Sequence, residues 1–387
     1  MNFDDQIDRK NTHSLKWDGL KKLFGSEDLL PMWVADMDFR PPQEVIDAFQ
    51  ERVDHGVFGY TIISDQLSET VCNWVKSRHS WPIQPEWLLY SPGVMPSIHT
   101  AIQALTEPGD QILLQSPVYT PFFHIIKSNG REVVNSPLVL NNGRYEINFE
   151  DLEIKLSSGV KMLLLSNPHN PSGRVWRKEE LFQVAELCEK YGVWIASDEI
   201  HADLVLKPHK HTPVASLSES IADITLTCMA PTKTFNLAGV QASFMVVTNK
   251  ECRRKLEAVQ AMDGFHMLNT FGAIAMEAAY KHGGPWLDEA LQYIRSNIDY
   301  VMKEIGEKIP KVEVINPEGT YLIWINCRQL GMSDDEIKKR LLNRGKLALN
   351  LGNAYGPGGE GFVRMNVASP RAMVEEGIKR LQIAFDA

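Results

Sequence analysis

Short apolar runs alternate with helical patterns through the middle of the chain. The runs have the length of strands and occupy residues 111–116, 161–166, 192–197, 223–229 and 243–248. A helical pattern at residues 178–191 precedes the third run. Strands that are apolar at nearly every position, and that alternate with helices, are typical of a mostly parallel sheet covered on both faces. The pattern therefore predicts an α/β fold.

The pattern changes in the last third of the chain. Residues 252–309 are predicted to be helical, with an interruption at residues 283–285. Beyond Pro310, strand patterns at 312–315, 321–326 and 362–367 and helices near 333–344 and from 370 predict a smaller α+β domain. The first 45 residues contain no long periodic element, and we expect them to pack on that domain. The predicted organisation is a large domain at residues 46–284 and a small domain, residues 1–45 plus 285–387, that lines a cleft.

The composition excludes several classes of protein. The chain has 387 residues, enough for two domains, and a net charge of -9 that argues against a nucleic-acid or anionic-membrane partner. Its five cysteines are scattered and form no C-x-x-C pair, which argues against a disulfide framework or a metal site and favours the cytoplasm. The acidic, polar N-terminus does not resemble a secretory signal, and no apolar run is long enough to span a membrane.

Three polar side chains follow predicted strands, at the edge where a parallel sheet binds its ligands. Asn170 lies in the turn Asn-Pro-His-Asn-Pro-Ser-Gly, Asp198 follows a second strand, and Lys233 follows a third. Ordinary strand-to-helix turns would explain one or two of these positions, with Asp198 as a helix cap and Asn170 as a turn former. A lysine, a carboxylate and an amide together instead indicate a pyridoxal 5′-phosphate (PLP) site. In such a site the lysine amine binds the cofactor aldehyde and the carboxylate keeps the pyridine nitrogen protonated.

Other residues are candidates for the remaining parts of this site. Backbone N–H groups at the start of a predicted helix, at Gly93, Val94 and Met95, suit a phosphate. Tyr119 either stacks on the pyridine ring or packs in the core. Arg364 lies in an apolar strand, where its partner is either a substrate carboxylate or an internal carboxylate.

Together these motifs resemble the PLP-dependent fold-type I family, the aspartate aminotransferase superfamily, over nearly the whole chain. The segments 30–39, Ser-Asp-Glu-Ile-His (197–201), Lys-Thr-Phe-Asn-Leu-Ala-Gly (233–239) and Tyr-Gly-Pro-Gly-Gly-Glu-Gly-Phe (355–362) are similar to its bacterial cystathionine β-lyase (C–S lyase) branch. The resemblance implies a seven-stranded sheet and a homodimer with shared active sites. It assigns Lys233 as the catalytic residue. The cofactor ligands that it implies are Tyr60 (from the neighbouring subunit), Gly93, Val94, Met95, Tyr119, Asn170, Asp198, His201, Thr232 and Lys233, and the substrate ligands are Ala35, Asn170 and Arg364.

The chain departs from typical aminotransferases at three positions. His201 replaces a tyrosine, Gln241 replaces a cation that binds the phosphate, and Ala230 replaces a phosphate-binding serine, for which Thr232 would compensate. The resemblance implies α,β-elimination of cystathionine and related cysteine S-conjugates to a thiol, pyruvate and ammonia. An aminotransferase remains open, because both reactions begin with removal of the α-proton. So does a regulatory protein that binds a macromolecule with an enzyme scaffold, whereas Lys233, Asp198 and Arg364 argue against a PLP-binding protein without catalysis.

Overall fold

The computed structural model describes residues 2–386 and is built on a seven-stranded sheet. The strand order is β2-β10-β9-β8-β7-β3-β4, and β10 runs opposite to the other six strands. The strands are β2 (Leu88–Ser91), β3 (Gln111–Leu114), β4 (Glu132–Asn135), β7 (Met162–Ser166), β8 (Trp194–Asp198), β9 (Thr225–Met229) and β10 (Ser243–Val246). The predicted α/β fold with a mostly parallel sheet is therefore confirmed.

Helices cover both faces of this sheet, as the apolar strands require. Every residue of β7 and β9 is buried. One face packs against α5 (Val94–Leu105), α6 (Pro121–Ser128) and α11 (Lys250–Met262), and the other against α7 (Phe149–Leu156), α8 (Lys178–Tyr191) and α9 (Glu219–Asp223). Helix α8 ends at Gly192, whose φ of 66° is a left-handed conformation that glycine adopts without a steric cost and that turns the chain into β8.

A group of helices joins the large sheet to the rest of the molecule. It contains α3 (Gln43–His55), α4 (Asp65–His79), the short α10 (Pro231–Thr234) and α12 (Thr270–His282). The region predicted as helical from residue 252 is interrupted twice rather than once. Besides the expected break at Gly283, residues 263–269 form a turn that ends where the Asn269 side chain accepts a hydrogen bond from the Gly272 amide and caps α12.

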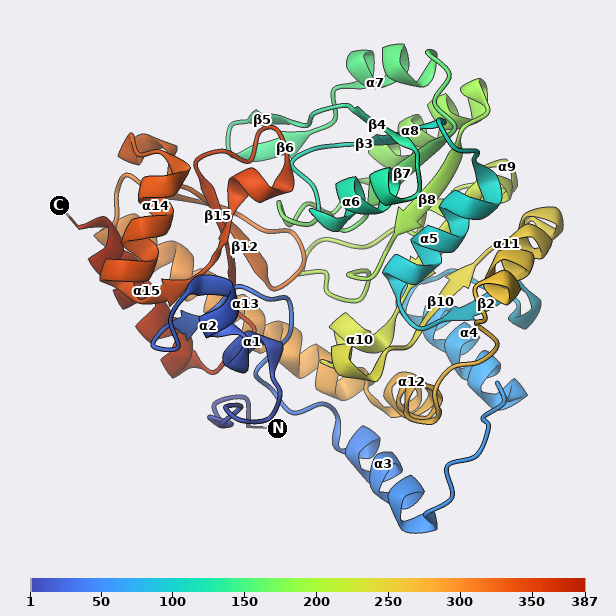
Figure 1. Ribbon diagram of the computed structural model, residues 1–387, viewed down its shortest axis with the longest axis horizontal. Coiled ribbons are helices and arrows are strands. Elements are labelled where there is room, and N and C mark those ends of the chain that lie inside the picture. The colour runs from blue at the N-terminus through green and yellow to red at the C-terminus, as the bar shows by residue number, and fades with distance from the viewer. Residues whose placement is uncertain (1, 387) are drawn as a thin grey trace.

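A second sheet lies across from the first (Figure 1). It is antiparallel, in the order β11 (Glu313–Ile315), β12 (Leu322–Asn326), β15 (Phe362–Asn366) and β14 (Asn350–Leu351). The long helix α13 (Gly284–Lys308) packs on α15 (Arg371–Phe385), while α14 (Asp334–Arg340) continues as a π-helical turn at Leu341–Gly345. A hairpin of β5 (Val139–Asn141) and β6 (Arg144–Glu146) stands apart from both sheets.

The N-terminal segment packs beside the second sheet. It contains two short helices, α1 (Leu15–Asp18) and α2 (Leu20–Phe24), and strand β1 (Leu30–Pro31), which pairs with β13 (Leu347–Ala348). The segment therefore contacts the C-terminal part of the fold through β13. Among residues 2–386, no helix combines the length and the apolar character needed to cross a bilayer.

Candidate active site

A cavity of about 430 Å³ lies at the carboxyl ends of β7, β8 and β9, where the chain turns away from the large sheet. It brings together nearly all the predicted site residues, namely Ala35, Gly93, Val94, Met95, Tyr119, Asn170, Asp198, His201, Thr232, Lys233 and Arg364. Tyr60 is the exception. It lies outside the cavity and is 96% exposed, so within one subunit it contributes nothing to the site.

Lys233 reaches the cavity from the first turn of α10, directly after the buried strand β9. Its Nζ donates a hydrogen bond of 2.6 Å to the backbone oxygen of Ala35. Burial, and secondarily the charge of Arg364, lower the pKa of the Lys233 amine to about 8. With this pKa about one-tenth of the amine is unprotonated at pH 7, far more than for an ordinary lysine, and the unprotonated form is the one that acts as a nucleophile or a base.

Asp198 is the last residue of β8 rather than the first residue beyond it. Its carboxylate accepts one hydrogen bond, 3.1 Å from the Ile200 amide, and has no ion pair within residues 2–386. Burial raises the pKa of the Asp198 carboxyl to about 7, and the nearby Glu199 adds to the effect. A buried carboxyl group with so few donors matches a missing cationic N–H partner, which is what a pyridine nitrogen supplies.

His201 is also buried without a full set of partners. Its Nδ1 has no hydrogen bond within the described residues, and its ring lies edge-on to Tyr321 with the centroids 6.2 Å apart. Burial lowers the pKa of His201 to about 3, so the ring is neutral. A neutral imidazole can donate to or accept from a ligand oxygen, as the predicted cofactor contact requires.

Arg364 extends into the cavity from β15 and bonds to polar atoms that carry no charge. It donates to Asn170 Oδ1 at 3.0 Å and to the Trp33 backbone oxygen at 2.9 Å. Its Nε is buried without a hydrogen bond, and its guanidinium lies 5.3 Å from the centroid of the Tyr355 ring. No carboxylate forms an ion pair with Arg364 within residues 2–386, so the alternative of an internal salt bridge is wrong. The guanidinium is therefore available to a carboxylate that enters the cavity.

The predicted phosphate ligands lie at the start of α5. Gly93 is its N-cap, and the Val94 and Met95 amides make no hydrogen bond within the described residues, as expected in the first turn of a helix. The Thr232 hydroxyl, which also faces this cavity, is likewise without a partner there. Gln241 lines the cavity at the position of the missing cation. These donors are neutral, so a phosphate would be held by dipoles and N–H groups more than by a charge.

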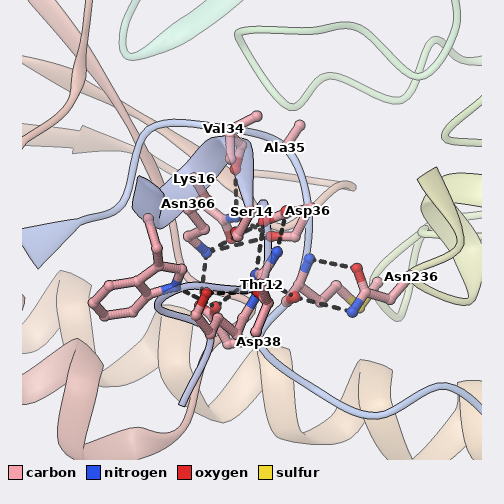
Figure 2. Close-up of polar contacts among 12 residues, drawn as sticks. Thr12, Ser14, Lys16, Val34, Ala35, Asp36, Asp38, Asn236 and Asn366 are labelled. Carbon is pink, nitrogen blue, oxygen red and sulfur yellow. Dashed lines mark hydrogen bonds and ion pairs between the residues drawn. The ribbon is translucent and has the colours of Figure 1, made fainter. Parts of the chain in front are cut away.

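Sequence reasoning missed how much of the site is backbone from the N-terminal segment 33–39, which we call the strap. The Arg364 and Lys233 side chains donate to the Trp33 and Ala35 oxygens, and Asn366, two residues after Arg364, donates to the Val34 oxygen at 2.7 Å. Figure 2 shows Asn236 on the side of the strap opposite to Asn366. Backbone acceptors leave no side-chain signature, so no pattern in the sequence predicts this arrangement.

A buried ion pair anchors the strap at its far end. Lys16 is fully buried, and its Nζ lies 2.6 Å from Asp38 Oδ2. Arg9 lies 2.8 Å from the other oxygen of Asp38 and 2.6 Å from Asp36. The Ser369 hydroxyl also donates to Asp38, at 2.7 Å. These contacts tie the strap to residues 9–16 and to Ser369, which lies between β15 and α15, and Figure 2 shows Lys16 beside Asp38.

Comparisons with known proteins cover most or all of the chain. The family model described as aminotransferase class I and II matches residues 27–381. The chain is 48% identical over 386 residues to a protein of Bacillus subtilis named cystathionine beta-lyase PatB, with 100% of both chains covered. It is 32% identical to protein MalY of Escherichia coli, covering 100% of this chain and 99% of that protein.

Solved structures also match the chain over nearly its full length. A PLP-bound putative aminotransferase from Clostridium difficile superimposes with a TM-score of 0.98 at 46% identity and covers 100% of both chains. Cystalysin from Treponema denticola, whose structure contains a PLP cofactor, superimposes with a TM-score of 0.96 at 35% identity, covering 99% of this chain and 98% of that one.

Proposed function

The chain belongs to the family of class I and II aminotransferases, and we propose that it is a PLP-dependent carbon–sulfur β-lyase. Its substrates are L-cystathionine and related cysteine S-conjugates, which it converts with water to a thiol, pyruvate and ammonia. The observation that carries the proposal is the meeting of the Lys233 amine, the Asp198 carboxyl and the Arg364 guanidinium in one cavity. The full-length identity with a protein named cystathionine beta-lyase supports this choice of reaction within the family.

The residues of the cavity fit PLP. Asp198 lacks a cationic partner, His201 has an unpaired nitrogen, and the amides of Val94 and Met95 are free for a phosphate. Bound PLP supplies an electron sink for the negative charge that develops at the substrate α-carbon. In this proposal Asp198 pairs with the pyridine nitrogen, Tyr119 covers the ring, and Gly93, Thr232 and their neighbours hold the phosphate.

The remaining residues bind the substrate and move its protons. Arg364 and Asn170, already 3.0 Å apart, would hold the substrate carboxylate, and the amide of Ala35 in the strap would assist. This grip would place the α-hydrogen beside Lys233 Nζ, which would remove it as a proton. The C–S bond at the β-carbon then breaks, and the protonated Lys233 can return a proton to the departing sulfur. Water added to the remaining three-carbon unit completes the formation of pyruvate and ammonia.

Product analysis separates this lyase from an aminotransferase. The purified holoenzyme is incubated with L-cystathionine in the absence of any keto acid, and free thiol and pyruvate are measured. We expect both to form in equal amounts, and to be absent with Lys233→Ala but not with the exposed control Lys22→Ala. Turnover that needs an added keto acid and releases no thiol would instead identify an aminotransferase.

The proposal includes a homodimer with shared active sites. Support comes from the link between α3 and α4, which runs along the outside of the molecule (Figure 1) and exposes Phe58, Tyr60 and Ile62 by 56%, 96% and 82%. Exposed apolar side chains gathered in one segment favour a protein interface. In the dimer, Tyr60 would reach the phosphate bound by the other subunit.

Hybrid dimers test the sharing of sites. Tyr60→Ala and Lys233→Ala should each lower activity, since each removes one part of every site. In a hybrid of the two variants, one site combines the intact Lys233 of one subunit with the intact Tyr60 of the other. Mixing should therefore restore up to half of the wild-type activity, whereas no recovery in a verified hybrid would place Tyr60 outside the site.

The predicted domains and location also belong to this proposal. A large domain at residues 46–284 would contain the seven-stranded sheet, and residues 1–45 plus 285–387 would contain the four-stranded one. Limited proteolysis that yields a stable fragment with these ends would test the boundaries. A cytoplasmic location accords with five free cysteines, four of them buried, and cell fractionation would test it.

A further inference from the structure

A second cavity, of about 770 Å³, shares no lining residue with the catalytic cavity. Its walls are the end of α4, the loop at residues 202–211 and the first half of α13. The loop begins immediately after His201 of the catalytic site. The cavity therefore adjoins the segment that carries Asp198 and His201, on a side that the proposed substrate does not reach.

The charged side chains of this second cavity are mainly cationic, although the chain as a whole carries a net charge of -9. Two carboxylates, Asp203 and Asp288, face four cations, which are Arg78, Lys207, Lys210 and Arg295. Arg78 is paired with Asp288 at 2.7 Å, and Arg295 is paired with Asp299. Lys207 and Lys210 have no ion pair within residues 2–386, so two positive charges remain for a ligand.

Buried contacts already occupy the Asp203 carboxylate. It accepts hydrogen bonds from Trp74 Nε1 at 3.0 Å and from Thr234 Oγ1 at 2.8 Å, and it lies 2.9 Å from His79 Nε2. These contacts hold the Asp203 carboxylate in place, and neither Lys207 nor Lys210 is among its hydrogen-bond or ion-pair partners.

His211 offers a second and independent indication of a ligand. Its side chain is only 2% exposed, and its Nε2 lies 2.6 Å from Glu199 Oε2. Its Nδ1 is buried and has no hydrogen-bond partner within the described part of the chain. With Nε2 held by the carboxylate, Nδ1 remains open to a polar group of a ligand.

Part of the wall is apolar. Val205, Leu206 and Leu291 line it together with Ala202. The volume lies within the range that is typical of sites for small molecules, roughly 300–1,000 Å³. An inorganic ion would leave this apolar surface uncovered, whereas a carbon skeleton with several carboxylates would cover it and pair with the lysines.

We propose that this cavity binds a small organic polycarboxylate through Lys207, Lys210 and His211. The bound molecule lies against two buried pairs that lead to the catalytic site. In one pair, His79 holds Asp203, which accepts from Thr234, the neighbour of Lys233. In the other, His211 holds Glu199, the neighbour of Asp198. Occupancy of the cavity thus acts on the two segments that position the catalytic groups.

Calorimetric titration with citrate tests the site. The titration uses the PLP-loaded Arg364→Leu variant, because Arg364 would itself bind a carboxylate in the catalytic cavity. We expect one citrate per subunit. The further substitution of Lys207→Gln and Lys210→Gln should weaken binding roughly tenfold or more, as expected when two exposed charge partners are removed.

The matched control is Lys338→Gln with Lys339→Gln, which removes the same charge from an exposed face of α14. It should leave citrate binding unchanged, and in the wild-type background the Lys207 and Lys210 pair of changes should leave basal lyase activity intact. The proposal is overturned if citrate does not bind at millimolar concentrations, or binds equally well without the two cavity lysines. Inorganic phosphate that binds as tightly as citrate would overturn the assignment to an organic polycarboxylate.

Discussion

Asn236 holds the strap in place from the turn that follows α10, the helix that carries Lys233. Its Oδ1 accepts a hydrogen bond of 2.9 Å from the Met37 amide, and its Nδ2 donates to the Met37 and Phe39 oxygens at 2.9 and 2.8 Å. Its φ of 57° is left-handed, a conformation that asparagine and aspartate tolerate better than other side chains. Asn236→Asp therefore preserves the backbone and the side-chain shape, while it replaces the Nδ2 donor with an anionic oxygen.

The expected loss of activity in Asn236→Asp follows from the hydrogen bonds that the substitution removes. Aspartate can still accept from the Met37 amide, but an anionic oxygen replaces the Nδ2 donor and faces two carbonyl oxygens. Two lost hydrogen bonds at about 0.5–1.5 kcal/mol each correspond to a loss of roughly ten- to a hundredfold in kcat/KM if the strap must be positioned for turnover. Because the strap bonds to Arg364, which we assign to the substrate carboxylate, the loss should fall mainly on KM.

Steady-state kinetics of thiol release measure this loss. Asn11→Asp is a suitable control, since Asn11 is exposed and has a φ of 60°, so the same substitution is made in the same conformation away from the site. The control should match the wild type in kcat and KM. If Asn236→Asp keeps kcat/KM within about threefold of the wild type, the strap does not position the substrate.

Three further substitutions test other parts of the structure. Lys16→Met leaves the buried Asp38 with Arg9 as its remaining cation, so we expect a loss of about 3 kcal/mol, the lower end for breaking a buried ion pair, in urea unfolding. In the cofactor-free protein, the raised pKa of Asp198 means that the folded state keeps a proton that the unfolded state has lost. The free energy of unfolding should therefore fall by up to roughly 1.4 kcal/mol per pH unit between about pH 4 and 7, and Asp198→Asn should flatten that profile. Gly173→Ala should lower the thermal midpoint, because φ there is 71° and an added Cβ would lie 2.7 Å from Pro317 Cβ.

The sequence predicts those parts of the fold that depend on local periodicity. The five apolar runs became β3, β7, β8, β9 and β10, because strands covered on both faces have no polar side to obscure the pattern. The edge strand β4, Glu132–Asn135, was not predicted. It contains no fully buried residue, so its sequence lacks the continuous apolar run that identifies the central strands.

The missed break at residues 263–269 has a different origin. Gly264 and Asn269 are turn and cap signals in the sequence, but they lie within an otherwise helical composition. The structure uses both, since Gly264 has a φ of 74° and Asn269 caps α12. The sequence therefore contains two local signals for a break, but the helical pattern of the longer region, residues 252–309, outweighed them in the prediction.

In the candidate site, too, some features could be predicted from local sequence patterns and others could not. Asn170, Asp198 and Lys233 could be predicted because each follows a strand, and parallel strands bring their carboxyl ends to one edge. The contacts of Asn350 and Tyr355 with Arg364 could not, because they depend on how β14 and the turn after it lie beside β15. Such contacts arise from pairing between distant segments, which local patterns do not encode.

In the two segments that carry Asp198 and Lys233, neighbouring side chains point to opposite sides of the sheet edge. Asp198 lines the catalytic cavity, while the next residue, Glu199, turns to His211. Lys233 likewise reaches Ala35, while Thr234 turns to Asp203. Successive side chains of an extended strand point to opposite faces, and successive positions of a helical turn diverge by about 100°. A chain that places a catalytic group in the cleft must therefore bury its neighbour behind the cleft, where the carboxylates of Glu199 and Asp203 need partners. His79 and His211 are these partners, and both line the larger cavity. A ligand bound there would therefore be linked to the segments of Asp198 and Lys233 through two hydrogen-bonded pairs.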